Sequence, residues 1–377
     1  KNQSTKASLY FAEVFFILSK NIAVFFGGVS GENEISIITG TMACNLLKRS
    51  GCAVLPVYIT QGGDFLCGDN LADIKNYSGG KIPLSSRACF AKGGIYVLSK
   101  RGKPKKFLPV YCALNCCHGG WGEGGGISGL CLAMSIPLAS AGVFESSALI
   151  DKYLTKILMK GLGVPTVEYL YLRDMGGATH VKDFPVMVKP ARLGSSIGVV
   201  KAESPAQLTD AIQAAFALDT AVLVERYISD RREINCAAYF ADGKIVTSPC
   251  EEVFGGDILS YDDKYSGSGK RVFPAHIPQQ QQEYIRSVTA KVYSALCMRG
   301  IVRFDFIIEG EKVYLSEINT VPGSLSHYLL SGNFKEFENI LSSLISQAVE
   351  DDKNIGSKML VNTGIINNFV SNACKIK

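Results

Sequence analysis

The chain has 377 residues, of which 47% are hydrophobic and 19% are charged, and its formal net charge is +5. This length predicts two or three domains with ample material for a core, and the composition is that of an ordinary soluble protein. The one basic cluster, Lys103-Pro104-Lys105-Lys106, is more typical of a surface turn than of a nucleic-acid patch. We therefore expect neither a nucleic-acid partner nor a membrane partner.

Residues 1–20 contain an apolar run, Leu9 to Leu18, that Glu13 interrupts. The run is short for a membrane span, and no small-residue cleavage site follows it. We interpret residues 1–20 as a loose N-terminal extension, and a signal peptide is the alternative.

Residues 21–140 are predicted to form a β/α domain. A buried strand at 21–26 ends at two glycines, and Ser30 is then a candidate N-cap for a helix that runs to about Ser50. Further strands are expected at 53–59 and 110–116, a hairpin at 81–98, a glycine-dense segment at 118–129 and a helix at 129–134.

Twelve cysteines are present, but no two form a C-x-x-C pair and most lie in apolar runs. Cys116, Cys117 and His118 are adjacent, yet no second pair of ligands has the spacing of a zinc site. The sequence therefore predicts reduced, buried thiols in a cytoplasmic protein.

Residues 141–227 are predicted to contain helices at 146–162 and 206–217 and strands at 184–189 and 221–227. Between two strands lies the segment 190–198, Pro-Ala-Arg-Leu-Gly-Ser-Ser-Ile-Gly, whose glycines and hydroxyls suit a phosphate cradle of backbone N–H groups. It is not a Walker A loop, because no G-K-[ST] opens a helix here. A plain hairpin turn has the same composition, so both interpretations stay open for this loop alone.

Residues 228–350 begin with a strand that Glu233 opens, and they include a helix at 279–299 and an amphipathic segment at 334–349. Residues 254–270 are rich in Gly, Asp, Ser and Tyr without periodicity, which indicates a functional loop or lid; it carries Lys264 and Tyr265. Residues 351–377 are predicted to be a polar, loosely held tail.

The strongest local pattern is a β-hairpin at 301–323, where two apolar runs flank a polar turn. Alternation places Arg303 and Asp305 on one face of the first strand, and Glu317 and Asn319 on one face of the second. A three-residue loop pairs Asp305 with Glu317, and a four-residue loop shifts the pairing by one. Two carboxylates and a carboxamide suit Mg²⁺, which takes oxygen ligands together with substrate phosphates. A solvated strand face with a charge pair is the alternative.

A series of motifs between Asn21 and about Leu330 resembles the ATP-grasp ligases, and among them the D-alanine–D-alanine ligases. Each motif is weak alone, but they occur in the family's order: Gly27 to Ser36, His118-Gly119 with Glu123, Asp151-Lys152, Lys189 to Gly198, Glu225, Asp262 to Tyr265, Arg303 to Asp305, and Glu317 to Gly323. The resemblance implies an α/β ATP-grasp fold with an N-terminal Rossmann-like (preATP-grasp) domain at 21–140. A central ATP-grasp domain at 141–227 and a C-terminal one at 228–350, with the catalytic hairpin, would follow.

The resemblance also implies the chemistry. Such enzymes phosphorylate the carboxylate of one D-alanine with ATP, and the amine of a second D-alanine attacks the acylphosphate to give D-Ala-D-Ala for peptidoglycan synthesis. Phosphoryl transfer needs positioning and charge neutralisation more than covalent help from the protein. A cytoplasmic homodimer is further implied.

The residue roles that the resemblance implies fall into three groups. Those expected to bind ATP are Lys152, Lys189, Ser195, Ser196, Glu225, Tyr227, Ile228, Glu233 and Lys264. Those expected to hold two Mg²⁺ or Mn²⁺ ions are Asp305, Glu317 and Asn319. Those expected at the D-alanines and the reacting carbonyl are Glu32, His118, Ser195, Tyr265, Arg303, Gly323 and Tyr328. For Glu32, simple compensation of a helix dipole is the alternative.

The chain departs from the family's pattern at three positions: Asn33 replaces a His or Arg, Gly124 replaces an aspartate, and Tyr328 stands where the family has a serine for the acceptor's carboxylate. The departure at Tyr328 leaves the identity of the acceptor substrate open. D-alanine is expected, and D-serine and D-lactate are alternatives, although Tyr265 favours a peptide product. A catalytically inactive nucleotide-binding module is disfavoured, because the phosphate lysines and metal ligands are all present.

Overall fold

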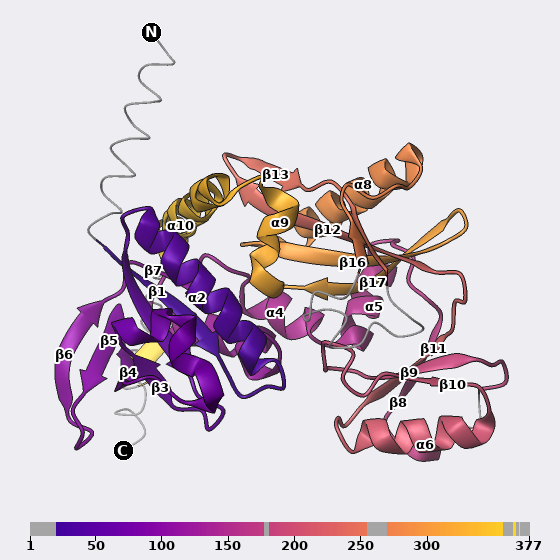
Figure 1. Ribbon diagram of the computed structural model, residues 1–377, viewed down its shortest axis with the longest axis horizontal. Helices are drawn as coiled ribbons and strands as arrows, with labels where there is room; N and C mark the ends of the chain where they lie inside the picture. Colours follow the sequence, from indigo (N-terminus) through magenta and orange to yellow (C-terminus); the bar gives the residue numbers. More distant parts are fainter. Residues whose placement is uncertain (1–19, 177–180, 255–269, 357–364, 367–368, 370–377) are drawn as a thin grey trace, which may run out of the picture.

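The computed structural model describes residues 20–176, 181–254 and 270–356, together with 365–366 and 369. Three sheets carry the fold, and they lie side by side in Figure 1. The expected N-terminal extension, most of the expected lid with Lys264 and Tyr265, and most of the C-terminal tail lie outside the described residues. Within the described ranges, no helix has the length and apolar character needed to cross a membrane, and every cysteine is a free thiol.

The first sheet has seven strands in the order β6-β5-β4-β3-β2-β1-β7. β1 is parallel to β2 and β7, and the other neighbours are antiparallel. The strands are β1 (Asn21–Gly27), β2 (Ala53–Ile59), β3 (Phe65–Cys67), β4 (Ser86–Ala91), β5 (Gly94–Leu98), β6 (Pro104–Pro109) and β7 (Cys112–Asn115). The short helices η1 (Asp69–Ala72) and η2 (Ile74–Gly80) connect β3 to β4, and η3 (Gly122–Gly126) and α3 (Ile127–Ala133) follow β7.

Two helices distant in sequence share the core of this first sheet. Helix α2 (Asn33–Arg49) follows β1, and α10 (Phe334–Gly356) comes from the end of the described chain. Phe337 and Leu341 of α10 are buried in one cluster with Ile22 and Leu47. The C-terminal part of the chain therefore returns to the N-terminal sheet. The predicted tail begins too early, since α10 continues past residue 351 to Gly356.

The expected N-cap of α2 is wrong. Glu32 is the N-cap residue, without a side-chain cap. Ser30 Oγ instead accepts from the Glu32 N–H at 3.0 Å and donates to the His118 carbonyl at 2.6 Å. Ser30 therefore ties the loop after β1 to the loop after β7.

The second sheet is antiparallel, in the order β10-β9-β11-β8, and α6 covers its buried face. Its elements are β8 (Tyr169–Leu172), β9 (Val186–Pro190), β10 (Val200–Ala202), α6 (Pro205–Phe216) and β11 (Val222–Arg226). The helix predicted at 146–162 is two helices, α4 (Val143–Leu149) and α5 (Lys152–Gly161). The break occurs because Asp151 has extended backbone angles and its carboxylate caps α5 by accepting from the Tyr153 and Leu154 N–H groups.

The third sheet has the order β15-β14-β12-β16-β17, with β13 paired to β12. Its elements are β12 (Arg232–Ala241), β13 (Lys244–Thr247), β14 (Glu251–Phe254), β15 (Lys270–Val272), α8 (Gln279–Ala295), β16 (Val302–Glu309) and β17 (Lys312–Asn319), followed by η5 (Gly323–Ser326) and α9 (His327–Leu330). Strand β16 alternates between buried and half-buried residues, as predicted, with Phe304 and Phe306 in the core.

The loop of the β16–β17 hairpin differs from both predicted lengths. Glu309 pairs with Lys312, which leaves a two-residue turn, and Phe306 pairs with Leu315. A bulge at Ser316 then restores the pairing of Asp305 with Glu317. The predicted pairing of Asp305 with Glu317 is therefore present, but a two-residue turn and a bulge produce it in place of a three-residue loop.

Candidate active site

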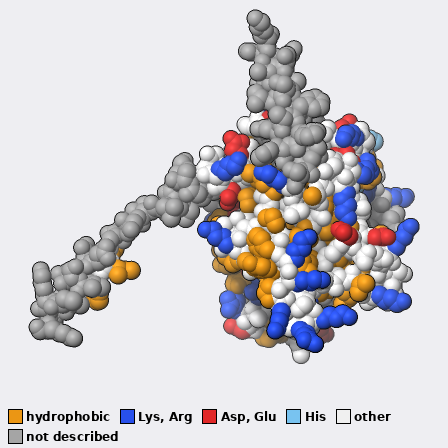
Figure 2. Space-filling model, turned by 90° about the vertical axis from the view of Figure 1, so that its left-hand side faces the viewer, with side chains coloured by type: hydrophobic (Ala, Val, Ile, Leu, Met, Phe, Trp, Pro, Cys, Tyr) orange, Lys and Arg blue, Asp and Glu red, His pale blue; other side chains and the backbone are white. Residues whose placement is uncertain are grey.

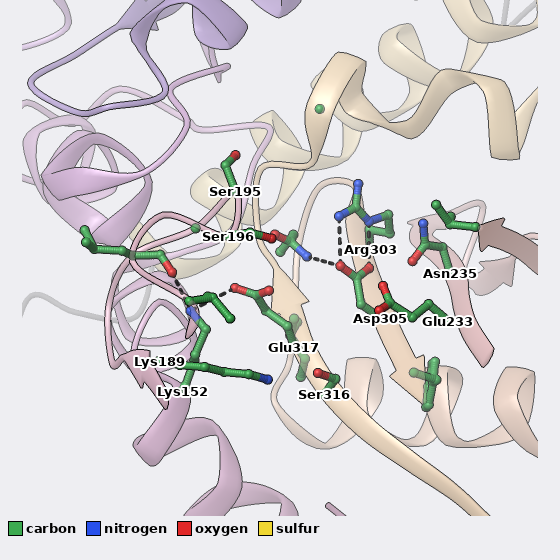
Figure 3. Close-up of a pocket in the computed structure, with 18 of the residues that line it drawn as sticks. Lys152, Lys189, Ser195, Ser196, Glu233, Asn235, Arg303, Asp305, Ser316 and Glu317 are labelled. Carbon is green, nitrogen blue, oxygen red and sulfur yellow. Dashed lines mark hydrogen bonds and ion pairs between the residues drawn. The ribbon is translucent and has the colours of Figure 1, made fainter. Parts of the chain in front are cut away.

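A cavity of about 470 Å³ lies where the three sheets meet. It brings together almost all of the residues singled out from the sequence: Glu32, His118, Lys152, Lys189, Ser195, Ser196, Glu225, Tyr227, Ile228, Glu233, Arg303, Asp305, Glu317, Asn319, Gly323 and Tyr328. Lys264 and Tyr265 lie outside the described residues. Figure 3 shows the hairpin residues Arg303, Asp305 and Glu317 on one side and Lys152 and Lys189 on the other.

The polar face of the hairpin is held by charge-assisted hydrogen bonds. Arg303 contacts Asp305 in a two-pronged arrangement, Nε to Oδ1 at 2.7 Å and Nη2 to Oδ2 at 2.8 Å. Asn319 Nδ2 donates to the same Oδ2 at 3.0 Å. Arg303 faces Asn319 and Asp305 faces Glu317 across the two strands, so the four side chains form one compact polar group.

Glu317 lies opposite the lysine that begins α5. Lys152 Nζ is 3.3 Å from Glu317 Oε1 and donates to the Leu193 carbonyl at 2.5 Å. Asp305, Glu317 and Asn319 thus offer the cavity two carboxylates and an amide, an incomplete oxygen set that phosphate oxygens can complete around Mg²⁺. Among the described residues, no three His, Cys, Asp or Glu side chains form a metal cage of their own. The donor set therefore fits a cation that is bound together with a phosphorylated substrate.

Glu225 in β11 is clamped between two lysines. Its carboxylate oxygens lie 2.6 Å from Lys189 Nζ and 2.8 Å from Lys156 Nζ. Burial by itself would raise the pKa of Glu225, but the two lysines outweigh it and lower the pKa to about 2. The sequence assigned Glu225 to the adenosine. In the structure its Oε2 contacts Lys189 and its Oε1 contacts Lys156, a buried lysine behind the cavity wall that had no role in the sequence prediction.

This clamp predicts an acid-sensitive contribution to stability. Because the pKa of Glu225 falls from 4.5 to about 2 on folding, its contribution is present above pH 4.5 and is lost as the pH falls toward 2. The contribution is on the order of a few kcal/mol, at ~1.4 kcal/mol per pKa unit. Denaturant unfolding at a series of pH values should show a steeper loss of unfolding free energy below pH 4.5 in the wild type than in Glu225→Gln. Equal slopes in the two proteins would contradict the clamp.

The loop predicted to be a phosphate cradle contains two serines with unusual backbone angles. Ser195 and Ser196 have φ values of 51° and 59°, in the left-handed region that non-glycine residues seldom adopt. Ser195 Oγ donates to Glu32 Oε1. A Cβ on Gly194 would lie 2.8 Å from Glu32 Oε2, so a larger residue at this position would displace the Glu32 carboxylate. The loop joins the antiparallel pair β9 and β10, so the hairpin interpretation is correct for the connection itself. The loop also links the second sheet to Glu32.

The end of the cavity beyond Lys189 has an aromatic and apolar wall. Tyr227 and Ile228 follow β11 and line it, and Glu233 stands beside them in an ion pair with Arg231 at 3.0 Å. Lys201 Nζ lies 4.5 Å from the centre of the Tyr227 ring. A flat apolar surface edged by a carboxylate suits an aromatic base with an attached sugar.

A buried network beneath the Glu32 and His118 end of the cavity has no counterpart in the sequence prediction. Thr39 Oγ1 accepts from the Ser324 N–H at 2.9 Å and lies 2.8 Å from His118 Nε2. Burial lowers the pKa of His118 to about 4, so its ring is neutral at pH 7. The network fixes the turn after β17, where Ser324 has a φ of 49°. Thr39 carried no sequence signal, because a threonine on a buried helix face is ordinary.

Glu123 is a second buried group at this side. Its carboxylate accepts from the Gly119 N–H at 2.8 Å and from the Val321 N–H at 3.3 Å. Burial and, after it, the nearby Glu32 raise the pKa of Glu123 to about 8. Glu123 is therefore largely protonated at pH 7. Asn235, Arg271 and Ser316 also line the cavity and were not predicted.

The chain matches two family models, described as D-ala D-ala ligase N-terminus over residues 21–141 and D-ala D-ala ligase C-terminus over residues 158–350. It is 34% identical over 356 residues to the D-alanine--D-alanine ligase of Thermosipho africanus, a match that covers 90% of this chain and 96% of that protein. The protein of the same name from Thermoanaerobacter sp. is 32% identical over 350 residues, covering 88% and 97%.

The chain is also similar to solved structures of ligases. The crystal structure of a D-alanine-D-alanine ligase from Helicobacter pylori matches with a TM-score of 0.70 at 28% identity, covering 86% of this chain and 98% of that one. The VanG D-Ala:D-Ser ligase from Enterococcus faecalis matches with a TM-score of 0.74 at 24% identity, covering 88% and 99%, and this likeness concerns the fold alone.

Proposed function

The chain belongs to the D-alanine–D-alanine ligase family, and we infer from this that it joins two D-alanine molecules in an ATP-dependent reaction that supplies D-Ala-D-Ala for peptidoglycan. Its fold is the predicted α/β ATP-grasp fold with an N-terminal domain. The observation that carries the inference is one cavity where Glu32 and His118 of the N-terminal match meet Lys189, Arg303 and Glu317 of the C-terminal match.

For phosphoryl transfer, the protein would supply positive charge and would hold the reacting groups in position. Lys152 and Lys189 would neutralise phosphate oxygens, with Lys189 held in place by Glu225. Asp305, Glu317 and Asn319 would hold the divalent cations, Mg²⁺ or Mn²⁺, which reduce the charge repulsion between phosphate and the attacking carboxylate. We propose two ions per site, because Asp305 and Glu317 stand directly opposite each other on the hairpin.

For the two D-alanines, the cavity offers charges of opposite sign. Glu32 would anchor the ammonium group of the first D-alanine. The Ser195 hydroxyl orients the Glu32 carboxylate by donating a hydrogen bond to it. Arg303 and the Gly323 N–H line the wall and would donate to the oxyanion formed when the second amine attacks the acylphosphate. The second amine must lose a proton for this attack, and phosphate leaves as the peptide bond forms.

The assignment predicts ATP hydrolysis that depends on a D-amino acid. Phosphate release should be negligible with ATP and Mg²⁺ alone and should rise on addition of D-alanine, with D-Ala-D-Ala as the product. Coupled phosphate release, with product identification by mass spectrometry, across D-alanine, L-alanine, D-serine and D-lactate measures this. Release without D-alanine, or only with L-amino acids, would contradict the proposal and would favour a binding module or another ligase.

The acceptor subsite is expected at Tyr328. Tyr328 and Ser324 line the cavity, and the Arg271 guanidinium lies 5.5 Å from the centre of the Tyr328 ring. Ser326 is buried instead, and its Oγ has no hydrogen-bond partner among the described residues. Tyr328 would therefore narrow the subsite around a small acceptor such as D-alanine, and its phenol would donate to the carboxylate.

Replacing Tyr328 with serine should admit larger D-amino acids or lower the acceptor KM. The serine would restore one hydrogen bond to a charged group in a wider subsite, an effect of ~1.5–3 kcal/mol. Steady-state kinetics with D-alanine, D-serine and D-threonine as acceptors measure this. An unchanged acceptor KM in Tyr328→Ser, together with a raised KM in Ser324→Ala, would move the carboxylate site to Ser324.

We further propose a cytoplasmic homodimer. The free cysteines of the described chain suit a reducing compartment. Leu132 in α3 and Phe144 in α4 are 71% and 62% exposed, which leaves apolar surface for a second subunit on two neighbouring helices. Sedimentation equilibrium of wild type and Phe144→Asp tests this, and a monomeric wild type would contradict it.

A further inference from the structure

The positive charge of the chain is concentrated in one stretch. From residue 74 to residue 122 there is no Asp or Glu, whereas the Lys and Arg side chains are all exposed: Lys75, Lys81, Arg87, Lys92, Lys100, Arg101, Lys103, Lys105 and Lys106. Since these exceed the net charge of +5 for the whole chain, the rest of the protein is net negative. This positive charge belongs to η2, to strands β4–β6 and to the segments that connect them.

Strand register gathers most of these side chains at one end of the sheet. Ala88 pairs with Val97, and Leu98 pairs with Pro104. The start of β4, the end of β5 and the start of β6 therefore lie together. We call this end the basic tip and define it by Arg87, Lys100, Arg101, Lys103, Lys105 and Lys106. Among the described residues, none of these six has an acidic partner within 4.0 Å.

Aliphatic side chains border the basic tip. Leu84, two residues before the start of β4, is 85% exposed, and Ile82 is 55% exposed. The segment is tied to η1, because Asn70 Nδ2 donates to the Leu84 carbonyl at 3.3 Å. Figure 2 views this side of the molecule and shows hydrophobic side chains among many Lys and Arg and few Asp or Glu.

We propose that the basic tip docks on an anionic lipid bilayer, with Leu84 and Ile82 entering the headgroup region. Lysines and arginines gain attraction at an anionic lipid surface, and aliphatic side chains flanked by cations suit the boundary between headgroups and acyl chains. In the strand order, the tip lies on β4–β6, whereas His118 follows β7 at the other edge of the sheet. Docking would therefore leave the cavity edge of the sheet free. The sequence expectation of no membrane partner is revised by this proposal.

Two other occupants fit less well. A second copy would bring two tips of the same charge together, and the lysines of the edge strand β6 oppose strand pairing with another chain. Single-stranded nucleic acid needs exposed aromatic rings for base stacking, but the tip offers aliphatic side chains. Phe107, which follows Lys106, is 38% exposed, but its ring contacts that of Tyr96 with centroids 4.9 Å apart.

The test is cosedimentation of the full chain with lipid vesicles at low salt. We expect binding to phosphatidylcholine vesicles that contain about one third phosphatidylglycerol, and at least about tenfold weaker binding to pure phosphatidylcholine. Lys105→Glu/Lys106→Glu should weaken binding about 30-fold or more, and Leu84→Ser several-fold at unchanged charge. Lys160→Glu/Lys244→Glu makes the same change in net charge at exposed positions on α5 and β13, and it should bind like the wild type.

Ligase activity of each variant in solution reports the integrity of the fold and should equal that of the wild type. Equal loss of binding in the tip and control variants would overturn the proposal, because net charge alone would then explain it. Binding to pure phosphatidylcholine as tight as to anionic vesicles would also overturn it, as would no binding to either. If single-stranded RNA displaces the protein from vesicles at equal phosphate concentration, the tip is a nucleic-acid site instead. None of these results bears on the ligase assignment.

Discussion

Glu317→Gln is expected to lower kcat by about a hundredfold or more while leaving the fold intact. Glu317 faces Asp305 across the hairpin and lies 3.3 Å from Lys152, at the point where metal and phosphate charges must balance. A neutral amide removes one negative charge from the cation site, and metal stabilisation of transferring phosphate is worth several kcal/mol. Initial rates of D-alanine-dependent phosphate release at saturating Mg²⁺ measure the effect.

A matched control lies in the same hairpin. Glu311→Gln makes the same chemical change in the exposed two-residue turn, away from the cavity, and should keep wild-type kcat. ADP affinity of Glu317→Gln should fall less than its kcat, because the wall formed by Tyr227 and Ile228 is unchanged. A Glu317→Gln enzyme that keeps more than about a tenth of wild-type kcat, a loss of under ~1.4 kcal/mol, would show that Glu317 is not a metal ligand.

Local pattern predicted the catalytic hairpin well. Alternation in β16 assigned Phe304 and Phe306 to the core and Arg303 and Asp305 to the cavity, because strand side chains alternate between faces whatever the rest of the fold does. The route to the Asp305–Glu317 pairing was not predictable. The two-residue turn shifts the pairing of β16 with β17 by one residue, and the bulge at Ser316 shifts it back. Neither feature changes the hydrophobic pattern of the sequence in a recognisable way.

Contacts between distant segments were the part that sequence reasoning could not supply. Thr39 meets Ser324 across 285 residues, and Lys156 meets Glu225 from a different secondary-structure element. Such contacts depend on how the sheets and helices pack, and no local periodicity records that. The grouping of basic side chains also depends on such contacts. Lys103 to Lys106 form a cluster in the sequence, but only the strand register brings Arg87 and Lys100 beside them.

Arg303→Met is expected to lower kcat by about 10²–10³-fold, the usual effect of removing one donor to a developing oxyanion. The guanidinium is preorganised, since Asp305 holds it at 2.7 and 2.8 Å and Asn319 in turn holds Asp305 at 3.0 Å. Arg303→Lys keeps the charge but cannot span both carboxylate oxygens, so its kcat should lie between those of the wild type and Arg303→Met. In pre-steady-state experiments, ADP formation reports the acylphosphate step and phosphate release reports the attack of the second amine. Phosphate release should be slowed in Arg303→Met, and ADP formation should be affected less.

The alternative is that Arg303 acts only by holding Asp305 for the metal. The Mg²⁺ dependence of the rate distinguishes the two roles. An oxyanion donor affects kcat at any Mg²⁺ concentration, whereas a group that only positions a ligand affects the apparent Mg²⁺ affinity, and high Mg²⁺ then restores the rate. Arg232→Met is the matched control, because Arg232 makes the same two-pronged contact with Glu252, at 2.6 Å for both nitrogens, on the neighbouring strand outside the cavity wall. Recovery of wild-type kcat by Arg303→Met at saturating Mg²⁺ would contradict the oxyanion role and leave Arg303 as a residue that positions Asp305.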